Sequence, residues 1–206
     1  MDPALAFRGF ILGFTIAAAV GPISLLVIRR TLAEGRVVGL ASGLGVATAD
    51  GTYGAIAAFG LGAITQLLVD ARPVLALAGG AFLLWLAWTT SRAEPHDPVA
   101  APPRRGGLAG AYLSILGLTL TNPMTILSFG ALFAGLGVTG SDLAGAALIT
   151  IGVLLGSAAW WLLLTSIVSV VRGRVTTTWI RRINVASGVV IGLFAVVSIA
   201  SVVVKS

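Results

Sequence analysis

The sequence AAAVGPIS, at residues 17–24, interrupts an apolar run that reaches from about residue 4 to residue 28. Proline within a helix removes one backbone donor and clashes with the carbonyl four residues earlier, so Gly21-Pro22 predicts a break. In hydrocarbon the freed carbonyl must find a partner in protein or trapped water. We therefore expect this break to face the protein interior or a cavity.

A second interruption, Thr121-Asn122-Pro123, lies in another apolar run about one hundred residues later. Asparagine is a preferred N-cap and proline suits the first helical position, so a second half-helix is predicted to begin here. Its unpaired N–H groups and positive dipole end would suit a carboxylate. Two interrupted spans in corresponding places of two halves point to a transporter's binding site. Each break alone could instead be a kink that only shapes packing.

The composition predicts an integral protein of the lipid bilayer. Of the 206 residues, 57% are hydrophobic and only 10% are charged, whereas soluble domains carry about 25% charge. The absence of cysteine and the single histidine, His96, exclude thiol redox chemistry and a His cluster, so no cofactor is expected. The net charge of +6 comes from arginines in short connections and does not indicate nucleic acid. Met1-Asp2-Pro3 lacks a basic region, so a signal peptide is not expected.

Six segments are long and apolar enough to span the bilayer as helices. They cover about 4–28, 37–64, 73–91, 108–137, 143–171 and 183–204. Most of the 13 Lys and Arg residues lie in the connections after the first, third and fifth segments. The positive-inside rule places those connections in the cytoplasm and both termini outside.

The two halves resemble each other weakly, which predicts an all-α membrane protein of two three-helix repeats with broken first and fourth helices. The repeats are residues 1–91 and 108–206, joined by a Pro-rich cytoplasmic linker at 92–107. Gly21-Pro22-Ile23-Ser24 parallels Asn122-Pro123-Met124-Thr125, and the same alignment brings Asp50 near Ser157. Three spans in each half give repeats of opposite orientation, an inverted repeat.

Asp50 is the one acid deep inside a predicted span. It lies thirteen residues beyond Val37, roughly 20 Å along a helix and therefore near the middle of the bilayer. An ionised carboxylate there is costly, so such a residue is a functional candidate. Asp50 could carry a proton or pair with a substrate ammonium. The alternative is a protonated packing element bonded to a backbone carbonyl.

The candidates for substrate binding or proton coupling surround Asp50 and the two breaks. They are Asp50, Gly21, Pro22, Asn122, Pro123, Thr48, Tyr53 and Thr125. The hydroxyl groups could instead bond to their own helices. Trp160 and Trp161 could face the cavity, although packing is the commoner role for such side chains. Small residues four apart, such as Gly9 and Gly13, allow close helix contact within one chain or in a homodimer.

These features together resemble the LysE-type amino-acid exporters, the lysine and homoserine/threonine exporter family. The resemblance rests on six predicted spans, the Gly21-Pro22 break, Gly43-x-Gly45 leading to Asp50, and Asn122-Pro123. Val20 replaces the first proline of the family's usual Pro-Gly-Pro, and Met124 stands where many members have Lys or His. The resemblance implies a transporter rather than an enzyme. It implies efflux of an amino acid or a similar small solute from a bacterial inner membrane, driven by protons.

Two other functions stay open. A divalent metal-cation exporter of the same superfamily would need several converging ligands, and the sequence offers one intramembrane carboxylate. A non-transporting membrane assembly subunit would need no carboxylate in mid-membrane.

Overall fold

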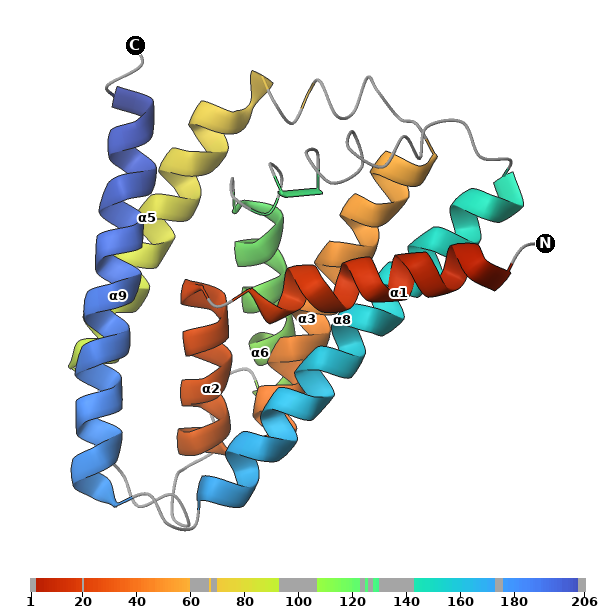
Figure 1. Cartoon of the computed structure of the whole chain (residues 1–206). Coiled ribbons are helices and arrows are strands. Elements are labelled where there is room, and N and C mark those ends of the chain that lie inside the picture. Colours follow the sequence, from red (N-terminus) through yellow and green to blue (C-terminus); the bar gives the residue numbers. More distant parts are fainter. Residues whose placement is uncertain are drawn as a thin grey trace.

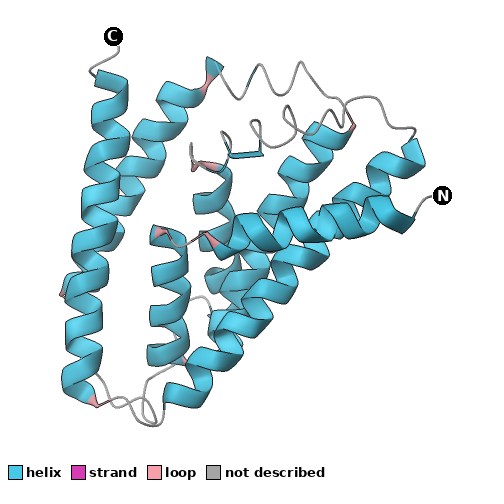
Figure 2. Ribbon diagram, viewed as in Figure 1, coloured by secondary structure: helices cyan, strands magenta, loops and turns pink. Residues whose placement is uncertain are grey.

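The computed structural model is helical throughout its described residues, apart from short turns (Figure 2). The structure describes residues 3–19, 21–59, 67, 70–92, 107–122, 125, 128–129, 143–172 and 176–203. The helices are α1 Pro3–Ala18, α2 Pro22–Glu34, α3 Arg36–Ala58, α5 Arg72–Ser91, α6 Gly107–Leu120, α8 Leu143–Arg172 and α9 Thr177–Val203. The predicted all-helical class is confirmed for this part of the chain.

The first predicted break is present. Helix α1 ends at Ala18, and α2 begins at Pro22 after a bend of 78°. Gly21 caps α2 in an extended conformation, with φ −145° and ψ −174°, and its carbonyl accepts the N–H of Leu25 at 3.1 Å. Pro22 therefore occupies the first helical position, where its missing N–H costs nothing.

The second predicted break also interrupts a helix. Helix α6 ends at Leu120, and the carbonyl of Asn122 accepts the N–H of Thr125 at 3.1 Å in a tight turn. Pro123 lies outside the described residues, as does most of the predicted fourth segment beyond the break.

Helix α9 begins earlier than we expected. It starts at Thr177 rather than near residue 183, so Arg181 and Arg182 lie in a helix and not in a connection. The Thr176 hydroxyl accepts the N–H of Trp179 at 3.4 Å, which satisfies a donor of the first turn. The Arg182 guanidinium lies 5.6 Å from the Trp179 ring centroid, an arrangement that suits the edge of a bilayer.

By length and apolar composition, one described helix could cross a membrane by itself, namely α8 with a mean hydropathy of 2.1. The bent pair α1 and α2 passes the same test if it is counted as one broken span. Helix α6 and residues 73–89 of α5 are apolar but shorter. The prediction of six spans therefore stays a prediction.

Glycines let α1 lie directly along α8, as Figure 1 shows. A Cβ at Gly9 would lie 2.3 Å from the carbonyl oxygen of Ile149, and one at Gly13 would lie 2.0 Å from that of Val153. Real side chains do not tolerate such distances, so only glycine permits this approach. Because both contacts step by four residues in the same sense, α1 and α8 run parallel. Here the small residues bring helices together within one chain.

We predict that Gly13→Ala lowers the melting temperature of the purified protein in detergent. The added methyl group meets backbone atoms, so α1 must shift and overpacking should cost about 1–3 kcal/mol. The control is Gly117→Ala in α6, where a Cβ meets no atom within 4 Å. That variant should match or exceed the parent, because alanine favours helix. Equal melting temperatures for the two variants would contradict the close packing.

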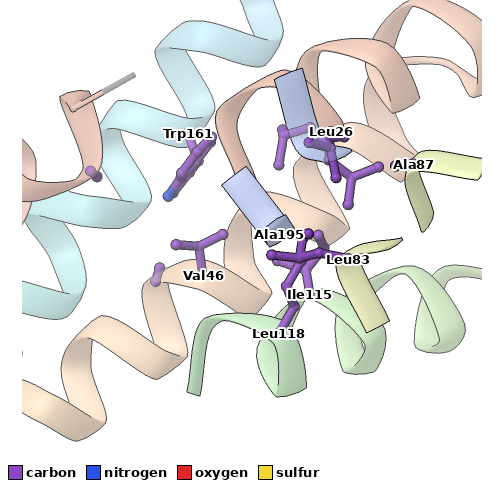
Figure 3. Close-up of a cluster of buried hydrophobic side chains, with 12 residues drawn as sticks. Leu26, Val46, Leu83, Ala87, Ile115, Leu118, Trp161 and Ala195 are labelled. Carbon is purple, nitrogen blue, oxygen red and sulfur yellow. The ribbon is translucent and has the colours of Figure 1, made fainter. Parts of the chain in front are cut away.

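The core surrounds the short helix α2. Figure 3 shows one cluster of buried side chains, and every described helix contributes at least one residue to it. Leu26 and Val27 of α2 are 1% and 0% exposed, and Trp161 of α8 joins them. Helix α2 contacts α3, α8 and α9, so its bent start is held in the middle of the protein.

Candidate functional site

The two helix breaks meet at one cavity of about 230 Å³. The first break contributes residues between Ile16 and Ser24, and the second contributes Asn122 and Thr125. Helices α3, α6, α8 and α9 complete the lining. The sequence expectation that the Gly21-Pro22 break faces a cavity is therefore confirmed.

Asp50 lies on this cavity and is 1% exposed. The Ser157 hydroxyl of α8 donates a hydrogen bond of 2.7 Å to its Oδ2 atom. Among the described residues that line the cavity, Asp50 is the one charged side chain. The site is thus suited to a group that carries one positive charge or to a proton.

The first turn of α2 lies against the same cavity. Gly21, Pro22, Ile23 and Ser24 all line it. The first N–H groups of a helix have no partner within the helix and carry its positive dipole end. Gly21 leaves room for a ligand, because a Cβ there would meet no atom within 4 Å. The cavity therefore combines an acid with a helix end that suits an anion.

Further polar groups and an apolar wall complete the site. The polar contributors are Thr119, Asn122, Thr125 and Ser128. The Thr119 hydroxyl donates to the Ile115 carbonyl of its own helix at 2.9 Å. The apolar contributors are Ile16, Ala17, Val46, Trp161 and Phe194. Trp161 thus combines both roles considered for it, since it packs in the core and lines the cavity.

The structure brings together five of the predicted site residues, namely Gly21, Pro22, Asp50, Asn122 and Thr125. Thr48 and Tyr53 are not among the lining residues and tie α3 to α6 instead. Thr48 donates to the Leu44 carbonyl at 2.9 Å and accepts a hydrogen bond from the Tyr112 hydroxyl. Tyr53 donates to the Leu120 carbonyl. Pro123 lies outside the described residues.

Several lining residues were not predicted. Thr119 and Phe194 have no distinctive sequence pattern, because hydroxyls and phenylalanines are common in apolar helices. Ser24 had a signal, since it parallels the candidate Thr125 in the alignment of the two halves. Ser157 does not line the cavity but donates a hydrogen bond to Asp50. The alignment of the two halves matched Ser157 with Asp50 as an equivalent position and did not predict this contact.

The described residues hold no group of three or more His, Cys, Asp or Glu side chains that could bind a metal ion. Hard divalent cations need several converging oxygen ligands.

Broken helices that meet at a cavity with a buried carboxylate are typical of membrane transport proteins. The comparisons agree with this class. The chain belongs to the LysE type translocator family, whose sequence model matches residues 14–201, so the predicted family is confirmed.

The chain is also similar to the uncharacterized membrane protein YahN of Escherichia coli (strain K12), with 32% identity over 120 residues. The match covers 53% of this chain and 50% of YahN, so the chain spans about half the length of that curated relative. No solved structure matches significantly.

Proposed function

We propose that the protein is a secondary active exporter of amino acids or related small metabolites across the bacterial inner membrane, coupled to protons. The observation that carries the proposal is the buried carboxylate of Asp50 on a cavity formed at two helix breaks. A buried acid in a membrane protein is costly and is retained where it binds a cation or carries a proton.

The cavity suits a zwitterion. The substrate ammonium pairs with Asp50, and the substrate carboxylate approaches the first turn of α2 beside Gly21. The substrate side chain then contacts the apolar wall that includes Trp161 and Phe194. This arrangement favours amino acids whose side chains are uncharged.

The proposed architecture is six spans in two inverted repeats, with both termini outside. Support comes from matched packing, since α1 runs parallel to α8 and α3 runs parallel to α6. The equivalent helices also pair, α3 with α8 and α5 with α9. In Figure 1 the ends of α2 and α8 and the start of α9 lie together at the bottom, while the C-terminus lies at the top. The end of α2, the end of α8 with Arg172, and the start of α9 with Arg181 therefore share one end, which supports placing that end in the cytoplasm.

The test is export from proteoliposomes that are loaded with single labelled amino acids and given a pH gradient. We expect amino acids with neutral side chains to leave fastest. Lysine should leave at least about tenfold more slowly, because a second buried ammonium without a carboxylate costs more than about 1.4 kcal/mol. Liposomes without protein are the control. An assembly subunit would give no efflux or counterflow with any amino acid, and a cation exporter would move divalent metal ions instead.

A further inference from the structure

Arg30 is a buried cation that the proposed binding site does not use. It lies in α2, is 2% exposed, and bridges two other helices. One terminal nitrogen donates to the Ser42 hydroxyl of α3 and to the Ala111 carbonyl of α6, both at 2.9 Å. The other terminal nitrogen donates to the Ser114 hydroxyl of α6 at 2.9 Å. The sequence had suggested a loop position, because the apolar run ends near residue 28.

Arg30 lies below the cavity in a regular stack of side chains. Helices α2, α3 and α6 each contribute one residue to each of three layers, and the residues of one helix are four positions apart. The first layer lines the cavity, the second is apolar, and the third, called the arginine layer, holds Arg30 and two of the residues that contact it. They are Pro22, Leu26 and Arg30 in α2, Asp50, Val46 and Ser42 in α3, and Thr119, Ile115 and Ala111 in α6. Four residues advance a helix by roughly 6 Å and return to the same face. The arginine layer is therefore roughly 12 Å from Pro22, Asp50 and Thr119, and roughly 6 Å from Val46, the middle-layer residue that also lines the cavity.

The middle layer of this stack is apolar and closely packed. Leu26, Val46 and Ile115 are 1%, 4% and 0% exposed and belong to the core cluster in Figure 3. Two further arginines hold the same end of α2. Arg29 donates to Asn184 of α9 at 2.9 Å, and Arg172 of α8 donates to the Leu32 carbonyl at 2.8 Å. These contacts lie between the cavity and this end of the protein along α2, α3 and α6, so they must separate before a solute can move along these three helices.

We propose that Arg30, with the apolar layer above it, is the cytoplasmic gate of the cavity. The proposal rests on the proposed function, because an exporter must admit its substrate from the arginine-rich, cytoplasmic end. The structure then represents a state closed on that side. Hydrogen bonds from the guanidinium to Ser42, Ala111 and Ser114 hold the gate shut, and water can replace those bonds when α2 moves away. Such exchangeable contacts allow two arrangements of similar free energy, as a switching element needs.

The test uses the absence of native cysteine. Ser24→Cys places a thiol on the cavity by a one-atom change. A membrane-impermeant maleimide is added to inside-out vesicles and, separately, to right-side-out vesicles. We expect Arg30→Gln to raise the labelling rate from the cytoplasmic side by about tenfold or more, since it removes charge-assisted hydrogen bonds, and to leave the rate from the other side unchanged.

The matched control is Arg36→Gln. Arg36 belongs to the same end of the protein, but its bond to Ser166 of α8 is exposed and does not reach α6. This variant should label like the Ser24→Cys parent. If Arg30→Gln labels faster from both sides, the substitution has loosened the packing of the whole protein. If its labelling rate from the cytoplasmic side is unchanged, Arg30 does not close the cavity on that side. Either result overturns the gate.

If Arg30→Gln does not fold, the double variant Ser42→Ala/Ser114→Ala replaces it, because it keeps the arginine and removes two acceptors. The same one-sided increase is expected, and its absence in folded protein overturns the gate. Labelling requires no substrate. A one-sided increase without export of any amino acid would therefore overturn the proposed function alone.

Discussion

Asp50→Asn is expected to reduce net export by at least about a hundredfold, because losing one partner of a buried charge pair costs about 3–5 kcal/mol. The amide has nearly the same shape as the carboxylate, and its oxygen can still accept the hydrogen bond from Ser157. The variant should therefore fold. The measurement is the rate of export from loaded proteoliposomes at several external pH values.

The matched control is Asp70→Asn, the same chemical change at an exposed position outside the cavity. It should export like the parent. Counterflow at equal pH separates the two roles of Asp50. Loss of counterflow indicates that Asp50 binds the substrate ammonium, whereas retained counterflow with lost pH dependence indicates proton coupling. Export by Asp50→Asn at the parental rate and with the parental pH dependence would rule out both roles.

The parts of the site that follow local rules could be predicted from the sequence. Gly-Pro within an apolar run kinks or breaks a helix, and a lone acid among apolar residues is conspicuous. Thr48 and Tyr53 were chosen only for closeness to Asp50 in sequence. Residues two apart on a helix point to different faces, which explains why Thr48 misses the cavity. Val46, four residues before Asp50, lies on the same face of α3 as Asp50 and lines the cavity.

The remaining features depend on tertiary contacts. Arg30 was assigned to a loop because a charge normally ends a membrane segment, yet α2 continues to Glu34. Its burial is possible because α3 and α6 supply acceptors that no reading of α2 alone reveals. Phe194 reaches the cavity from α9, more than one hundred residues from Asp50 in sequence. Helical periodicity fixes faces within a helix, whereas the choice of partner helices follows from packing.

Replacing Gly21 by larger residues is expected to slow transport progressively while the fold is kept. The backbone of Gly21 is extended, with φ −145°, which any residue adopts, and a Cβ there meets no atom within 4 Å. The new side chain therefore enters open space at the start of α2, where the substrate carboxylate is proposed to bind. Gly21→Ala, Gly21→Val and Gly21→Leu should lose export progressively. The last should lose about 10–100-fold, as crowding of about 1–3 kcal/mol implies.

The measurement is export rate together with melting temperature for each variant. Gly117→Val is the matched control, because Gly117 also has open surroundings but does not line the cavity. The Gly21 series should show falling export at a nearly constant melting temperature, and the control should keep its export. If Gly21→Leu exported at the parental rate, the carboxylate would not bind at the start of α2. If melting temperature and export fell together, Gly21 would serve the bend between α1 and α2 and not the substrate.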